Sequence, residues 1–97
     1  MKIKKATKFF PSFRTGTINA DRKTITQIVG FEPDVHSDPD KVTHEWRFTV
    51  DGIRCAIWDY KGSAEYNTYS CYMPVMVGKE LFGSIMYRSE HEYRNDV

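Results

Sequence analysis

The sequence predicts an α+β protein with a small antiparallel sheet of three to four strands and two short helices packed on one face. The first supporting observation is the alternation of apolar and polar residues over 42–50, which has the period of a half-buried strand. The second is the pair Asp51-Gly52, whose tolerance of positive φ makes it a strong signal for a hairpin turn. The third is that two segments, 25–29 and 75–82, carry helix start and stop signals.

Chain length and charge define the expected organisation. We expect a single domain over residues 1–97, with a basic segment at 1–23, a core at 24–83 and a polar tail at 84–97. The basic segment holds seven lysines and arginines against one aspartate, a net charge of +6. The remaining residues hold seven cations against twelve anions, a net charge of −5. Such an asymmetry indicates either a contact surface or a basic segment that folds back on the acidic remainder.

Composition excludes several classes of protein. A hydrophobic content of 40% and an aromatic content of 14% exclude a disordered chain. No apolar run approaches the roughly 20 residues that span a bilayer, and no apolar segment follows the basic N-terminus as in a signal peptide. We therefore expect a cytoplasmic protein without a membrane partner. Two cysteines, Cys55 and Cys71, are too few for a disulfide framework and are expected to be buried thiols.

The N-terminal third predicts one strand and one helix. Residues 2–10 form a weakly alternating first strand that Pro11 interrupts, and residues 14–18 are predicted as a loop or a short strand. The helix at 25–29 is predicted to begin with a capping box in which Thr24 caps and Gln27 reaches back. Gly30 then ends it by taking the left-handed C′ conformation.

The central hairpin has a register that its two-residue turn fixes. The core face is predicted to pair Val50 with Ile53, Phe48 with Cys55, and Trp46 with Ile57. The opposite face is predicted to pair Thr49 with Arg54, Arg47 with Ala56, and Glu45 with Trp58. That second face is mixed in polarity, so it is either solvated or covered by another element.

The C-terminal third predicts a strand followed by a helix. Residues 68–73 alternate as a third strand, and Pro74 suits the first turn of a helix over 75–82 that Gly83 stops. The polar tail from Tyr87 is expected to be helical or frayed.

Part of the sequence is similar to a known group of proteins. The segment Lys41-Val-Thr-His-Glu-Trp-Arg-Phe-Thr-Val-Asp-Gly52, followed by Ile57-Trp-Asp-Tyr-Lys-Gly62, resembles short, mostly uncharacterised proteins of tailed bacteriophages. The similarity covers roughly residues 24–83 and includes the turn Gly30-Phe-Glu-Pro33. It implies a phage origin and an accessory role in the cytoplasm of the infected bacterial host. It assigns no catalytic residues and no cofactor.

The resemblance, the small size and the lack of a catalytic set together favour a non-enzymatic role. The leading hypothesis is a phage accessory protein that binds and modulates a host component, such as a bacterial defence protein. Exposed sheet edges also make a homo-oligomer a possible assembly.

An alternative hypothesis is a module that sequesters a nucleotide or nucleic acid. Aromatic rings beside arginines suit stacking on bases, and lysines suit phosphates. The candidates are Arg47, Arg54, Trp58, Tyr60 and Lys61 on the hairpin and Lys4, Lys5, Lys8 and Arg14 in the basic segment. In the structural alternative, the basic segment covers the second face of the hairpin, and its phenylalanines are part of a core.

A third hypothesis is a small enzyme that uses His44 and Asp59, which the register places opposite one another. A carboxylate beside an imidazole fixes one tautomer and supports acid–base chemistry. A structural pair at the end of the hairpin explains the same residues. The acidic loop offers possible ligands at alternating positions, namely Asp34, His36, Asp38 and Asp40. It lacks the glycine and glutamate of a calcium loop, so no metal site is expected.

Overall fold

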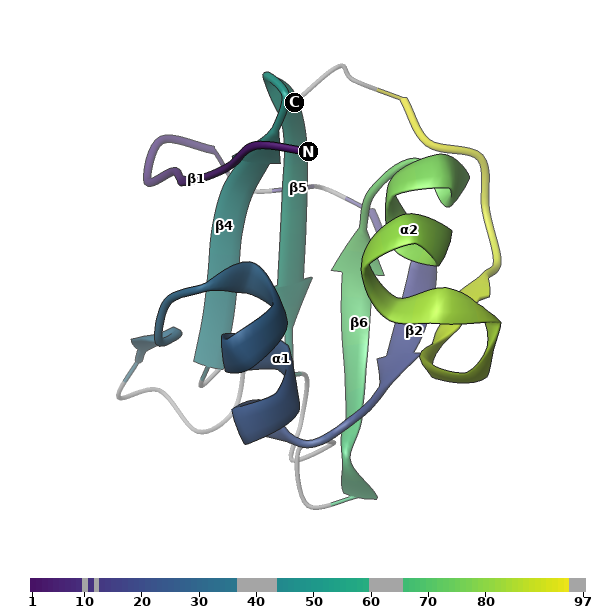
Figure 1. The fold of residues 1–97 in the computed structure, drawn as a ribbon, viewed down its shortest axis with the longest axis horizontal. Coiled ribbons are helices and arrows are strands. Elements are labelled where there is room, and N and C mark those ends of the chain that lie inside the picture. The colour runs from purple at the N-terminus through teal and green to yellow at the C-terminus, as the bar shows by residue number, and fades with distance from the viewer. Residues whose placement is uncertain (10, 12, 37–43, 60–65, 95–97) are drawn as a thin grey trace.

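The computed structural model describes residues 1–9, 11, 13–36, 44–59 and 66–94. In this part of the chain it places two helices and seven strands (Figure 1). The helices are α1 (Arg22–Val29) and α2 (Val75–Met86). The strands are β1 (Ile3–Lys5), β2 (Gly16–Asn19), β3 (Asp34–Val35), β4 (His44–Val50), β5 (Ile53–Trp58), β6 (Thr68–Tyr72) and β7 (Tyr87–Ser89).

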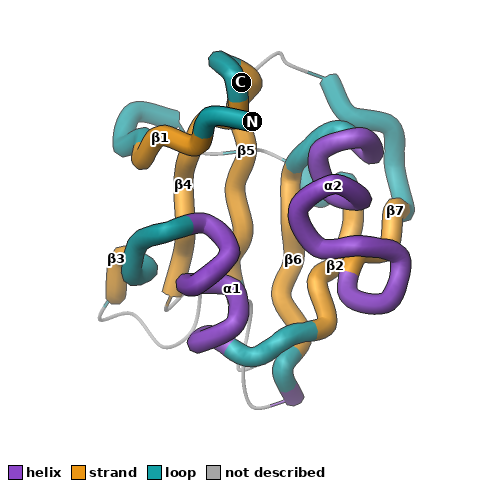
Figure 2. Tube along the Cα trace, in the orientation of Figure 1, coloured by secondary structure: helices purple, strands orange, loops and turns teal. Residues whose placement is uncertain are grey.

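All strand pairs in the described residues are antiparallel and join into one sheet with the order β1-β4-β5-β6-β2-β7, in which β3 also pairs with β4. Figure 2 shows both helices on the same side of this sheet. The α+β class and the helices on one face are therefore confirmed. The sheet is larger than the predicted three to four strands, because the prediction misses β3 and β7, which have too few residues to show a period of two.

The β4–β5 hairpin has the predicted register. Val50 pairs with Ile53 and Trp46 with Ile57, across a turn in which Asp51 and Gly52 have φ values of 51° and 85°. The predicted core face is buried except at Ile53, which lies beside the turn and is 36% exposed. The strict alternation in this segment was therefore sufficient to identify the side of the strand that belongs to the larger of two clusters of buried side chains.

The tail from Tyr87, predicted to be helical or frayed, begins instead with a strand. Residues 87–89 form β7, which pairs with β2 and buries Tyr87. In turn, β2 lies between β6 and β7, so the segment predicted as a loop or short strand is an inner strand of the sheet. A Cβ atom on Gly16 would lie 2.3 Å from the Arg88 carbonyl oxygen. Glycine at this position is what allows β7 to approach β2 so closely.

Helix α1 begins three residues earlier than predicted. Its N-cap is Asp21, whose side chain accepts a hydrogen bond of 2.8 Å from the Thr24 backbone N–H. Hydrogen bonds from the Thr24 side chain and from its backbone N–H lower the pKa of the Asp21 carboxyl. The predicted cap, Thr24, thus lies in the first turn of the helix. Aspartate is an N-cap residue at least as favourable as threonine, so the residue types alone allow either start. Gly30 ends the helix with φ of 94°, as predicted.

Helix α2 begins after Pro74, which is its N-cap rather than a residue of the first turn. The assigned helix continues to Met86, but Gly83 has a non-helical conformation with φ of 74°. The expectation that Gly83 stops the regular helix is correct in that sense, and the residues after it begin a new turn.

The sheet separates two clusters of buried side chains. The larger cluster fills the space between the sheet and the helices and includes Trp46, Phe48 and Ile25. The smaller cluster lies on the opposite face and consists of Phe9, Ala56 and Tyr72, with partly buried neighbours. The second face of the hairpin was expected to be either solvated or covered by another element. The structure shows that the N-terminal segment packs on it through Phe9.

Gly16→Ala tests the close approach of β7. We expect a loss of about 1–3 kcal/mol in the free energy of unfolding, because the added methyl group meets a backbone oxygen that cannot move independently. Amide hydrogen exchange at Tyr87 to Ser89 should accelerate at the same time. Asn19→Ala, at an exposed position of the same strand, is the control. An unchanged exchange rate in β7 would contradict this account.

Candidate functional site

Arg47, a predicted ligand contact, is a structural residue in the interior. Its side chain is 10% exposed. Its Nη1 atom donates hydrogen bonds of 3.0 Å and 3.4 Å to the carbonyl oxygens of Thr7 and Phe9. Its Nε lies 3.1 Å from a Glu45 carboxylate oxygen, and Nη2 lies 3.6 Å from Asp34. The prediction that Arg47 faces a ligand is therefore wrong, because the N-terminal segment occupies that face and uses the guanidinium as its anchor.

The other hairpin candidates are separated from one another. Trp58 is half-buried and packs against the smaller cluster. Arg54 is exposed, and its guanidinium lies 5.8 Å from the centre of the Phe9 ring. Tyr60 and Lys61 lie outside the described residues. Of the candidates that the structure describes on this surface, Arg54 is therefore exposed and Trp58 is half-buried.

The lysines and arginine of the basic segment have different surroundings. Lys5 forms an ion pair of 3.3 Å with Asp34, and Arg14 one of 3.1 Å with Glu90. Lys4 and Lys8 are exposed, and no carboxylate of the described residues lies within ion-pair distance of either. An open depression of about 340 Å³ is lined by Lys5, Ala6, Thr7, Lys8, Phe9, Thr49 and Arg54. The structure therefore brings Lys8 and Arg54 together although they are distant in sequence.

The predicted pair of His44 and Asp59 is present at the open end of the hairpin. The imidazole Nδ1 lies 3.0 Å from Asp59 Oδ2, and the His44 backbone N–H donates to Oδ1 at 2.9 Å. The Asp59 backbone N–H in turn donates to the His44 carbonyl oxygen. The carboxylate is buried and the imidazole half-buried. The pair thus continues the hairpin ladder beyond the last residue of β5.

Arg22, the first residue of α1, completes this arrangement. Its Nη1 lies 2.9 Å from His44 Nε2. A guanidinium can only donate, so Nε2 accepts and the ring proton is placed on Nδ1, where it is donated to Asp59. The chain Arg22–His44–Asp59 therefore holds a neutral imidazole in one tautomer and ties the start of α1 to the hairpin. Sequence reasoning missed Arg22, because nothing in its local sequence connects it with the hairpin.

This geometry resembles an acid–base pair with one decisive difference. In such a pair the outer imidazole nitrogen removes a proton from a nucleophile or from water. Here that nitrogen is occupied by Arg22, at the edge of an open depression of about 740 Å³ that Asp21, Glu32 and Tyr69 also line. The arrangement therefore holds the end of the hairpin in place. The outer nitrogen of the imidazole is engaged by Arg22 and is not available to act as a base.

The two cysteines are not nucleophiles in the folded protein. Both are free thiols and both are fully buried. Burial raises the pKa of the Cys55 thiol to about 12 and raises the pKa of Cys71 as well. Their predicted role as buried thiols is confirmed.

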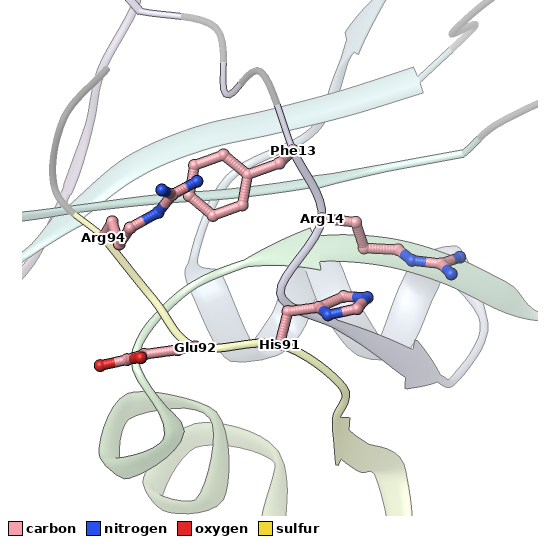
Figure 3. Close-up of a pocket in the computed structure, with 5 residues that line it drawn as sticks. All are labelled: Phe13, Arg14, His91, Glu92 and Arg94. Atoms are coloured by element: carbon pink, nitrogen blue, oxygen red, sulfur yellow. The ribbon is translucent and has the colours of Figure 1, made fainter.

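A third depression, of about 580 Å³, lies between the N-terminal and C-terminal segments (Figure 3). It is lined by Phe13, Arg14, His91, Glu92 and Arg94. The Arg94 guanidinium lies 4.7 Å from the centre of the Phe13 ring, whereas Glu92 points away from that ring in Figure 3. The Tyr72 hydroxyl donates to the Arg94 carbonyl oxygen and holds this segment on the sheet. Sequence reasoning misses this depression, because no pattern in the polar tail connects His91, Glu92 or Arg94 with the N-terminal segment.

The described residues contain no group of three or more His, Cys, Asp or Glu side chains placed to hold a metal ion. Within the same residues, no helix has the length and apolar character needed to cross a membrane. Comparison of the chain with protein-family models, with curated proteins and with solved structures yields no match.

Replacement of Asp59 tests the role of the His44 pair. We expect Asp59→Ala to lower the free energy of unfolding by about 3 kcal/mol, because it removes a buried acceptor from two donors of His44. Asp59→Asn should lose less, since its amide oxygen still accepts from the backbone N–H. Urea denaturation gives both values. A change below about 0.5 kcal/mol for Asp59→Ala would show that the pair does not stabilise the hairpin.

The buried thiols make stability depend on alkaline pH. The unfolded chain releases the Cys55 proton near pH 9.0, whereas the folded protein retains it to about pH 12. The free energy of unfolding should be unaffected by this group below pH 9 and should fall above it, by about 1.4 kcal/mol per pH unit. The measurement is the difference between wild type and Cys55→Ala in urea denaturation at several pH values. If the free energy of unfolding changes with pH in the same way in both proteins, the raised pKa of Cys55 is contradicted.

Proposed function

We propose that this chain is a non-catalytic binding protein of the phage accessory type that it resembles, and that it acts on a bacterial host protein. The observation that carries the proposal is the exposure of three large apolar side chains of α2. Met76 is 82% exposed and Ile85 is 92% exposed, and Val75 beside Met76 is also exposed. Three large apolar side chains on one element are a typical feature of protein–protein interaction sites.

The surroundings of α2 support this reading. Val77 and Phe82 bury the inner side of the helix against the sheet, so packing explains those residues and leaves Met76 and Ile85 without a structural role. Lys79 and Glu80 are exposed on the same helix and add opposite charges to the apolar surface. An apolar centre with charged neighbours matches the composition of protein interfaces, in which methionine is enriched.

The candidate catalytic groups also favour binding over catalysis. The outer nitrogen of His44 is occupied by Arg22, and burial suppresses ionisation of Cys55. A surface that binds and blocks a host protein requires neither a free imidazole nitrogen nor an ionised thiol.

The proposal predicts that Met76→Glu and Ile85→Glu together abolish partner binding. A tagged wild-type protein should recover one dominant protein from a lysate of the bacterial host, and the double variant should recover at least about tenfold less, as expected when residues at the centre of an interface are removed. Both positions are exposed, so stability should change by no more than about 0.5 kcal/mol.

Lys23→Glu, at an exposed position of α1 and outside this surface, is the control for added negative charge and should retain the partner. Equal recovery by the double variant and the wild type would overturn the role of α2. Sedimentation of the purified wild type at several concentrations gives an independent readout. Self-association that the double variant abolishes would identify the occupant of this surface as a second copy and would contradict a host partner.

A further inference from the structure

The sheet face opposite the helices carries a row of cationic and hydroxyl side chains. In β1 and β4, Lys4 pairs with Thr49, and in β4 and β5 Thr49 pairs with Arg54. Residues directly opposite one another on adjacent strands project to the same side of a sheet. Phe48 and Val50 belong to the cluster under the helices, so the residue between them, Thr49, faces the other side together with its two partners.

The loop that follows β1 brings a further cation to this row. Lys8, Thr49 and Arg54 line the open depression of about 340 Å³ described above. Lys5 also lines it, but its ammonium group pairs with Asp34. None of the described residues that line it carries a carboxylate. A depression with lysine and arginine at its edges and no acidic residue in its lining attracts anions.

The loop is held in place by groups other than a ligand. Arg47 binds the carbonyl oxygens of Thr7 and Phe9, so these oxygens point into the protein. The described residues contain no cis peptide bond, and in a trans peptide the N–H points opposite to the C=O. The Lys8 N–H therefore points away from Arg47. The backbone thus turns its acceptors inward and at least one donor outward, which suits an anion.

Arg54 is also held in place by contacts within the protein. Its guanidinium lies 5.8 Å from the centre of the buried Phe9 ring, and its carbonyl oxygen accepts a hydrogen bond of 3.0 Å from the Tyr93 hydroxyl. An arginine that rests on an aromatic ring retains its donors and loses less side-chain freedom when it binds a phosphate. Lys4, Lys8 and Arg54 are thus three cations around a preformed surface.

The two other depressions described above fit an anion less well. The one beside Phe13 is lined by Glu92, and its Arg14 is paired with Glu90. The one beside His44 is lined by Asp21 and Glu32. The depression at Lys8 and Arg54 is therefore the strongest candidate.

We propose that Lys4, Lys8, Thr49 and Arg54 form a binding site for phosphate groups. The ligand is a free nucleotide or the backbone of a single-stranded nucleic acid, which share this chemistry. The site lies on the face opposite α2, so it is independent of the protein-binding surface proposed above.

The test compares a labelled single-stranded oligonucleotide, followed by fluorescence anisotropy, with ATP, followed by titration calorimetry. With three cations in contact, the logarithm of the oligonucleotide affinity should fall with the logarithm of salt concentration with a slope of about −2. Neutralising two of them in Lys4→Gln/Lys8→Gln should weaken binding about 25-fold at about 0.1 M salt and reduce the slope to about −0.7. The control, Lys23→Gln/Lys79→Gln, removes the same charge from α1 and α2.

The outcomes separate the two sources of phosphate. Tight oligonucleotide binding that depends on Lys4 and Lys8, with much weaker ATP binding, identifies a nucleic-acid backbone. ATP binding that depends on the same lysines, with no gain from a longer strand, identifies a free nucleotide. Absence of binding by both ligands overturns the proposal. An equal loss in the control variant also overturns it, because the effect would then be net charge alone.

Discussion

The register of the β4–β5 hairpin is the constraint on which the rest of the structure depends. Asp51 and Gly52 both adopt positive φ, and a two-residue turn of this kind allows one alignment of the flanking strands. A slip of one residue would turn Trp46 and Phe48 away from the helices and place Arg47 beneath them. The same alignment sets His44 opposite Asp59 at one end and Thr49 opposite Arg54 at the other. The core, the hydrogen-bonded hairpin end and the cationic row are thus three consequences of one turn.

The hairpin was predictable because its signals are local and redundant. Alternation over seven described residues, a turn that requires positive φ, and apolar partners on the returning strand all indicate the same register. The pair of His44 and Asp59 followed from that register alone. The stop of α1 at Gly30 was equally local, whereas its start was placed too late because Asp21 and Thr24 both satisfy the rule for an N-cap.

The parts that were not predictable depend on distant partners. The strand β7 has three residues, and only its pairing with β2 makes it a strand. The burial of Arg47 results from its contacts with Thr7 and Phe9, about 40 positions earlier in the chain. No pattern around Arg47 distinguishes an arginine that binds a ligand from one that binds the protein's own backbone. The same holds for Arg22, whose contact with His44 spans 22 positions.

The inner position of β2, between β6 and β7, has a consequence for the order of folding. Gly16 pairs with Cys71 on one side and with Ser89 on the other. The partners of this strand lie between 49 residues later (Asn19 with Thr68) and 73 residues later (Gly16 with Ser89). The hairpin, in contrast, joins residues that are neighbours in the chain. Loop-closure entropy makes such distant pairing slow, and local pairing is fast. During synthesis on the ribosome, the hairpin therefore has all of its residues well before β2 meets β7, and the inner strand that begins near the N-terminus is among the last to be completed.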